Sequence, residues 1–263
     1  MDLGIKGKTA IVCASSKGMG RASAFQFARE GANIVLCART GKRLQETAEE
    51  IRKETGVDVL AIPADVTKAE DRAKIIGETV SRFGTVHILV NNSGGPPPGS
   101  FADFQADEWA KAVEANLLSA IEWCRGVIPF MKQQRWGRIV NIASISVKQP
   151  IDGLILSNTA RAGLIGFAKT ISRELASHNI LVNNVCPGTI LTDRIMDLAR
   201  SRAAMADVTV SDILKHMEEE IPVKRIGRPE EAANLVVFLA SEAAAYITGT
   251  TILVDGGLYR GIM

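Results

Sequence analysis

Short runs rich in β-branched residues alternate with longer stretches of helical periodicity along the whole chain, and this alternation restricts the fold more than any other feature. The pattern is typical of a parallel sheet whose strands are joined by crossover helices. The runs are apolar on both faces, as burial between two helical layers requires, and the right-handedness of such crossovers places helices on both faces of the sheet. We predict an α/β fold with a seven-stranded, doubly wound parallel sheet, its strands lying near residues 8–13, 33–37, 57–62, 86–91, 137–143, 179–185 and 249–254.

A chain of 263 residues could hold one or two domains, and the unbroken alternation favours a single domain over residues 1–263. The 31 basic residues nearly balance the 29 acidic ones, which excludes the charge excess of a nucleic-acid-binding protein or a polybasic membrane anchor. No apolar run reaches the roughly 18 residues that span a bilayer, and no signal peptide is recognisable, so a cytoplasmic protein is expected. The four cysteines are scattered without a C-x-x-C pair, which predicts buried thiols and no metal site.

Two long helices and one insertion are expected in the second half of the chain. The helices, at about 105–133 and 154–177, carry continuous apolar stripes that can pack on the sheet or on a second subunit. Asn116 lies beside the first stripe, where an amide is either hydrogen-bonded in a core or positioned for chemistry. Residues 193–221 form an insertion with an amphipathic pattern of its own, which favours a lid over an apolar ligand.

The turn after the first strand has the composition of a phosphate-binding loop. The strand runs directly into Ser15-Ser16-Lys17-Gly18-Met19-Gly20, and a helix is expected to begin at about Gly18. Glycines at such a turn let the backbone approach a pyrophosphate, and the helix N-terminus supplies free N–H groups and a favourable dipole. Two glycines alone could also mark an ordinary turn, but this position is where a doubly wound sheet binds dinucleotides.

Several motifs together carry a resemblance over nearly the whole chain. The turn after the first strand matches the pattern T-G-x-x-x-G-x-G, except that Cys13 and Ala14 replace the leading Thr and Gly. A later segment matches N-N-A-G with Ser93 in place of Ala. The other matching motifs are an Asp-Val pair, P-G-x-x-x-T, GRPEEAANLVVFLAS and ITGTTILVDGG. With these motifs the chain resembles a short-chain dehydrogenase/reductase and, among these, is similar to the 3-oxoacyl-acyl-carrier-protein reductases. The resemblance implies a Rossmann fold and a homotetramer, or a dimer, built through the two long helices.

The resemblance also implies which residues contact a nicotinamide cofactor. These are Ala14, Ser16, Lys17, Gly18, Met19, Gly20, Arg39, Asp65, Val66, Asn91, Ser93, Gly94, Arg161, Pro187, Gly188, Ile190 and Thr192. At position 14 a methyl group replaces the hydrogen of a glycine, so we expect Ala14 to have a negative φ.

The choice between the two nicotinamide cofactors follows from charge. An acid at the end of the second strand would hold the ribose hydroxyls of NAD, whereas a basic residue accepts the 2′-phosphate of NADP. This chain has Arg39 at that point and Lys17 in the glycine turn. The two cations predict a preference for NADP(H) over NAD(H), unless both are only solvated surface charges.

Two of the four catalytic positions of the family match this chain. In the family a Tyr protonates the carbonyl oxygen, a Lys four residues on assists it, a Ser orients the substrate and an Asn holds a water. Asn116 and Ser144 match, but Ser157 stands at the Tyr position and Arg161 at the Lys position. An alkyl hydroxyl is a far weaker acid than a phenol, and an arginine stays protonated, so Arg161 can hold a ribose or an oxyanion but cannot shuttle protons.

Three functions remain open at this point. The protein can be an NADP(H)-dependent oxidoreductase acting on a small, apolar carbonyl, alcohol or imine compound, in which Ser144 and Arg161 polarise the substrate and water or Lys148 supplies the proton. It can be a catalytically weakened nicotinamide-binding protein that acts as a partner subunit or regulator. It can also carry out other chemistry at Ser157, although no motif places one of the three histidines nearby.

Overall fold

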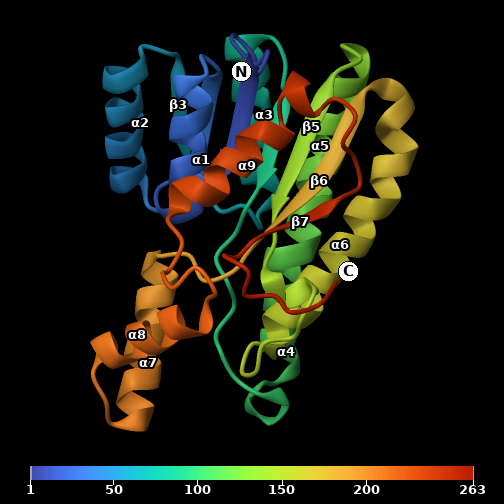
Figure 1. Ribbon diagram of the computed structural model, residues 1–263. Helices are drawn as coiled ribbons and strands as arrows, with labels where there is room; N and C mark the ends of the chain where they lie inside the picture. The colour runs from blue at the N-terminus through green and yellow to red at the C-terminus, as the bar shows by residue number, and fades with distance from the viewer. Residues whose placement is uncertain (1, 263) are drawn as a thin grey trace.

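The computed structural model describes residues 2–262 and shows one parallel sheet flanked by helices on both sides (Figure 1). The strand order is β3-β2-β1-β4-β5-β6-β7, and all neighbouring strands are parallel. The predicted seven-stranded, doubly wound α/β fold is confirmed. The strands are β1 Thr9–Cys13, β2 Asn33–Ala38, β3 Val59–Pro63, β4 Ile88–Asn91, β5 Gly137–Ile142, β6 Ile180–Pro187 and β7 Thr251–Val254.

Helices connect the strands and cover both faces of the sheet. They are α1 Gly18–Arg29, α2 Gly41–Thr55, α3 Ala69–Phe83, α4 Ala106–Val113, α5 Ser119–Gln133, α6 Ile155–Leu175, α7 Asp193–Ala206, α8 Val210–Glu220 and α9 Pro229–Leu239. Short 3₁₀ turns lie at Phe101–Asp103, Ile145–Val147, Ala176–His178 and Glu242–Ala244, and a π-helical turn lies at Glu114–Leu118. Helices α1, α2 and α9 pack on one face, and α3, α5 and α6 pack on the other.

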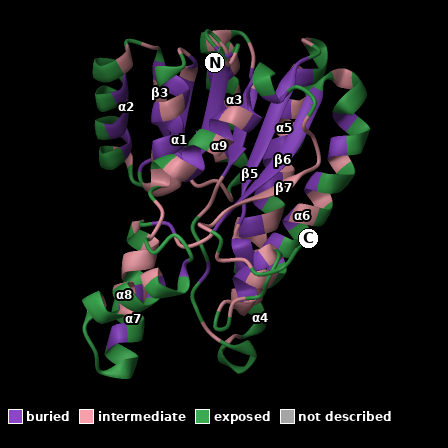
Figure 2. Ribbon diagram, in the orientation of Figure 1, coloured by how far each residue is buried: buried purple, intermediate pink, exposed green. Residues whose placement is uncertain are grey.

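The sheet is buried between two apolar clusters, one on each face (Figure 2). Phe27 of α1 and Val236 of α9 belong to the first cluster, and Trp123 of α5 and Ile139 of β5 belong to the second. The four cysteines are buried free thiols, as predicted. Within residues 2–262, no helix meets the length and apolarity needed to cross a membrane, and no cluster of side chains could hold a metal ion.

The insertion at 193–221 consists of two helices, α7 and α8, that pack on each other. They stand beyond the carboxyl ends of the strands, apart from the layers that sandwich the sheet (Figure 1). Most of their surface is exposed, in contrast with the sheet (Figure 2). This place over the carboxyl edge is where a doubly wound sheet binds its ligands.

His87 gives the fold a titratable contact that acid should break. Its Nδ1 accepts a hydrogen bond of 3.0 Å from the Thr9 N–H, and burial, assisted by nearby Lys8, lowers the His87 pKa to about 4. The ordinary pKa of a histidine is about 6.5, so between pH 6.5 and pH 4 His87 is protonated in the unfolded chain but neutral in the native protein. The free energy of unfolding should therefore fall as the pH drops from 6.5 toward 4. Urea unfolding of wild type and His87→Gln at pH 7.5 and 5 tests this, and equal losses in both proteins would contradict it.

Candidate active site

A cavity of about 550 Å³ lies at the carboxyl edge of the sheet, between the glycine turn, the ends of β4, β5 and β6, and helix α7. Such a volume is typical of a small-molecule site. The predicted site residues that line it are Ala14, Lys17, Gly18, Met19, Ser93, Gly94, Ser144, Ser157, Arg161, Pro187, Gly188, Ile190 and Thr192. Ser16, Gly20, Arg39, Asp65, Val66, Asn91 and Asn116 do not line it; of these, Val66, Asn91 and Asn116 border a second space, described below.

The glycine turn is held tightly against its neighbours. The Ser15 N–H donates to the Cys37 carbonyl, the Cys37 N–H donates to the Ser15 hydroxyl, and the Asn92 side chain donates to the Cys13 carbonyl. A Cβ at Gly20 would lie 2.5 Å from the Ala14 carbonyl oxygen, so only glycine fits there. These contacts fix a narrow cradle at the N-terminus of α1, whose first N–H groups have no partner inside the helix.

The expectation of a negative φ at Ala14 is wrong. Ala14 has φ of 49°, in the left-handed region that favours glycine. An L-residue accepts this conformation at a cost of about 1–2 kcal/mol. The bonds of the adjoining Ser15 and Cys13 to neighbouring strands impose the turn geometry, and the methyl group of Ala14 is accommodated within it.

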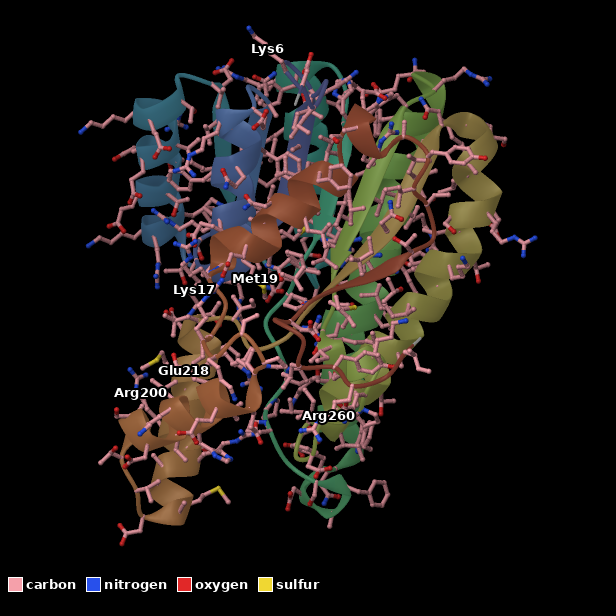
Figure 3. All side chains as sticks on the ribbon, viewed as in Figure 1. Lys6, Lys17, Met19, Arg200, Glu218 and Arg260 are labelled. Carbon is pink, nitrogen blue, oxygen red and sulfur yellow. The ribbon has the colours of Figure 1, made fainter. Side chains whose placement is uncertain are left out.

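Three charged groups meet beside the turn and connect it to α7. Lys17 Nζ lies 2.8 Å from Asp193 Oδ2, and Arg43 Nη1 lies 3.4 Å from the same oxygen. Lys17 lowers the pKa of Asp193, first by hydrogen bonding and then by its charge, with Arg43 adding to the effect. Lys17 extends from the lower end of α1 toward α7 and α8 (Figure 3). Asp193 and Arg43 were not singled out from the sequence.

Arg39 stands apart from this group of charges, exposed at the end of β2. It is close enough to Asp65 to lower the pKa of that carboxyl, although the Thr67 N–H, which donates to Asp65 Oδ1 at 3.0 Å, has the larger effect. The carboxylate of Asp65 is therefore engaged in hydrogen bonds within its own turn.

Asn116 lies in a π-helical turn inside the helix predicted over 105–133. The predicted helix is confirmed over residues 106–133, where α4 continues through the π turn Glu114–Leu118 into α5. Asn116 is buried, its amide donates to the Ala112 carbonyl, and its Oδ1 accepts a hydrogen bond of 3.2 Å from the Ser93 hydroxyl. Single π turns inside α-helices are frequent at functional sites.

A small space of about 10 Å³ is lined by Asn116, Ser93 and Arg161. Its volume is about that of one water molecule. Because Arg161 and Ser93 also line the large cavity, this space adjoins the place where a ligand would bind.

Ser157 and Arg161 form a buried pair one turn apart on α6. Arg161 Nε donates to Ser157 Oγ at 3.2 Å, and Nη1 donates to the carbonyls of Ile142 and Ala143 at 3.0 and 3.2 Å. Burial lowers the pKa of Arg161 to about 10, which still leaves the guanidinium charged at neutral pH. Its Nη2 bonds to no residue in the described part of the chain. Ser144 lines the same cavity, and its hydroxyl accepts a hydrogen bond from the Ser146 N–H.

The phenol of a tyrosine is missing from the cavity lining of residues 2–262. Tyr246 is fully exposed, and Tyr259 lies in the segment after β7 without lining the cavity. The acidic or basic groups available to a ligand inside the cavity are thus carboxylates and guanidinium or ammonium groups. His87, His178 and His216 do not line the cavity either.

Comparison with known proteins identifies the family. The sequence model of a family described as enoyl-(acyl carrier protein) reductase matches residues 13–259. The 3-oxoacyl-[acyl-carrier-protein] reductase of Staphylococcus epidermidis is 38% identical over 252 residues, which are 96% of this chain and 99% of that protein. The chain belongs to the short-chain dehydrogenase/reductase family. Its relatives in this family are oxidoreductases that act on carbonyl or hydroxyl groups of small molecules.

Solved structures of this family show the same fold in full. L-sorbose reductase from Gluconobacter frateurii, complexed with NADPH and L-sorbose, superimposes with a TM-score of 0.95 at 36% identity, covering 100% of both chains. YwfH, an NADPH-dependent reductase involved in bacilysin biosynthesis, gives a TM-score of 0.92 at 32% identity over 97% of this chain and 99% of its own. Both of these short-chain dehydrogenases/reductases use NADPH.

Proposed function

We propose that this protein is an NADP(H)-dependent oxidoreductase that transfers hydride between the nicotinamide and a carbonyl, alcohol or imine group of a small molecule. The observation that carries the proposal is the buried Ser157–Arg161 pair, which shares one cavity with Ser144 and with the glycine turn. The cavity brings the groups that would bind a dinucleotide next to those that would polarise an electrophile.

The residues around the turn fit the dinucleotide. The cradle closed by Gly18 and Gly20 leaves the N-terminus of α1 open to a pyrophosphate, and a Cβ at Gly20 would destroy it. Lys17, Arg43 and Arg39 supply positive charge for a 2′-phosphate, and the residue before Arg39 is Ala38 rather than an acid. Thr192 and Gly188 border the far side of the groove, and Asp65 with Val66 would lie beside the adenine.

When bound, the reduced cofactor supplies a hydride to an electrophilic carbon. The Ser144 hydroxyl and Arg161 Nη2 can both donate to the oxygen of a carbonyl, and fixed donors aimed at developing negative charge stabilise the transition state in a water-poor site. Arg161 is anchored for this task by the carbonyls of Ile142 and Ala143.

Carbonyl reduction also requires one proton on the oxygen, and we assign it to water. Lys148 is exposed and does not line the cavity, whereas the small space beside Asn116 and Arg161 has room for about one water molecule. The hydride and this proton together convert a ketone to an alcohol. An iminium substrate needs the hydride alone and becomes an amine without a proton donor.

Ser157 and Arg161 take the places that Tyr and Lys have in the family. The rate of carbonyl reduction is therefore expected to lack the contribution of a general acid. A general acid contributes about 10²- to 10⁴-fold to the rate, whereas orientation of the reactants can contribute roughly 7–11 kcal/mol of barrier lowering. Hydride transfer to ketones should therefore be slow but measurable. A nicotinamide-binding regulator without turnover is the second candidate, favoured by the missing phenol.

The proposal extends to the lid and to assembly. Residues 193–221, with α7 and α8, would close over the cofactor and substrate in a single domain of 1–263. A homotetramer or dimer through α4, α5 and α6, in the cytoplasm, is the arrangement that the family resemblance implies.

Replacing Lys17 should remove the cofactor preference. We expect Lys17→Ala to weaken NADPH binding tens-fold with little effect on NADH, because only NADPH carries the 2′-phosphate that this ammonium would contact. Fluorescence titration of both reduced cofactors measures this, with Lys6→Ala, at the opposite end of the molecule (Figure 3), as the control.

Turnover distinguishes the two candidate functions. Loss of reduced nicotinamide is followed with ketones, acyl thioesters and imines. Tight NADPH binding without turnover on any of them would favour the regulator, and equal affinity of the wild type for NADH would overturn the cofactor preference.

A further inference from the structure

The lining of the cavity carries an excess of positive charge. Beside the turn, the single carboxylate of Asp193 is shared by two cations, Lys17 and Arg43. The other carboxylate that lines the cavity, Glu220, lies 3.7 Å from the His216 imidazole. The guanidinium groups that line the cavity belong to Arg161, Arg194, Arg202 and Arg260.

Two of these guanidinium groups, those of Arg161 and Arg194, line the same cavity without a carboxylate partner. Arg161 is only 7% exposed, and neither it nor Arg194 forms an ion pair with any carboxylate of residues 2–262. Arg161 has its pKa lowered mainly by burial, and the charge of Arg194 lowers it further, so the two cations repel each other. A buried charge without a counter-ion is costly, and an anion placed between the two groups would stabilise both.

Arg194 is positioned to receive such an anion. It is the second residue of α7, and its Nη2 donates to the Pro96 carbonyl at 2.6 Å, so its side chain spans from the lid to the loop after β4. Its Nε and Nη1 bond to no residue in the described part of the chain and are free to donate. A guanidinium fixed in this way matches the planar geometry of a carboxylate.

Much of the remaining lining is apolar. It comes from the segment between β5 and α6 and from α7 and α8, namely Ile145, Ile151, Leu154, Ile195, Leu198 and Met217, with Gln149 as a polar neighbour. Arg260 enters from the C-terminal segment, in the space between the lid helices and α4 (Figure 3). A ligand suited to these walls has an apolar body and a single anionic head.

We infer that the substrate of this enzyme is an apolar compound with a carboxylate next to the reacting carbon, and that Arg194 binds this carboxylate. The inference rests on the proposed hydride transfer, because it places the reacting group at Ser144 and Arg161. The carboxylate would bridge the Arg194 and Arg161 guanidiniums, and its binding would tie α7 to the loop after β4. Arg194 is thus a substrate-binding residue carried by the lid.

The test compares a carboxylate with its neutral ester. The probes are 4-methyl-2-oxopentanoate and its methyl ester, titrated calorimetrically into the NADPH-saturated protein and into the protein alone. We expect the acid to bind at least about tenfold more tightly than the ester, since hydrogen bonds to charged groups are the stronger ones. Arg194→Gln should weaken binding of the acid about 10- to 100-fold and leave the ester unchanged, and Arg194→Lys should recover part of the loss.

Arg200→Gln is the matched control. Arg200 lies on the same helix, but its guanidinium pairs with Asp197, and it points to the outer side of the lid (Figure 3). This variant should bind acid and ester as the wild type does. If Arg200→Gln and Arg194→Gln weaken binding of the acid equally, the arginines act through their general electrostatic field and not through a specific contact. That result would overturn the inference.

The two hypotheses fail separately. If NADPH binds and neutral ketones or imines are reduced, but acid and ester bind equally, or neither binds, the carboxylate inference is overturned and the proposed function stands. If NADPH does not bind, the proposed function fails, and discrimination between acid and ester by the protein alone then decides whether Arg194 marks an anion site of another kind.

Discussion

The double variant Ser157→Tyr/Arg161→Lys is expected to reduce ketones about 10²- to 10⁴-fold faster than the wild type, which is the contribution of a general acid. A phenol has a pKa of about 10 that a neighbouring cation can lower toward neutrality, whereas an alkyl hydroxyl stays un-ionised. Ser157 faces a cavity of about 550 Å³, so an aromatic ring at this position has room to extend toward the electrophile. A lysine at 161 can replace the guanidinium at the carbonyls of Ile142 and Ala143.

A control with the same ring separates acid catalysis from shape. Ser157→Phe/Arg161→Lys carries the ring without the hydroxyl and should show no gain. Steady-state kcat/KM on a ketone and on an iminium compound completes the design, because the iminium accepts hydride without a proton. A gain restricted to the ketone supports the role assigned to position 157, and an equal gain on both substrates would show that the new ring acts by packing.

The sheet could be predicted from the sequence because its signal is local and repeated. Each strand is a short apolar run, and burial on both faces suppresses the alternation that an exposed sheet would show. The predicted ends differ from the observed ones by a few residues, as at β3, which begins at Val59 rather than at residue 57. Strand ends depend on where pairing with the neighbour stops, and that contact lies far away in the sequence.

The π turn inside the helix over 105–133 had no such local signal. Apolar spacing continues through Glu114–Leu118, but the backbone takes a π turn that rotates Asn116 toward the Ser93 hydroxyl. The same holds for Ala14, whose positive φ is imposed by bonds from Ser15 and Asn92 to other strands. In both places a tertiary contact overrides the local preference.

The site could be predicted in part, and the missing part is the set of polar contacts that α7 makes with the rest of the chain. Positions on the strand ends follow from topology, which places Gly18, Ser144 and Arg161 at one edge. Asp193 was missed because its partner Lys17 is 176 residues away in the sequence, and Arg194 because its contact is the carbonyl of Pro96. No periodic sequence pattern predicts an ion pair that an inserted helix makes with a distant residue. Only the orientation of α7 brings these groups to the cavity.

Gly20→Ala is expected to lower NADPH affinity and kcat/KM about 100-fold, since misplacing a reacting group by about 1 Å can cost that much. The new Cβ would lie 2.5 Å from the Ala14 oxygen and 2.9 Å from the Asn92 amide nitrogen, and the first of these belongs to the backbone of the cradle itself. The turn would have to move away from α1, but Ser15 is bonded to Cys37 and resists this movement. Fluorescence titration with NADPH and thermal unfolding measure the two consequences.

Two further variants decide whether the loss comes from this contact. Gly77→Ala, in the middle of α3 with no atom within 4 Å of its added Cβ, should bind NADPH normally and stabilise the fold by roughly 0.5–1 kcal/mol through helix propensity. In Ala14→Gly/Gly20→Ala the oxygen at position 14 can shift more freely, because glycine tolerates positive φ without strain. Partial recovery of NADPH affinity in that double variant would locate the defect in the cradle. An unchanged 100-fold loss would place the defect in the contact of the new Cβ with the Asn92 amide, 2.9 Å away.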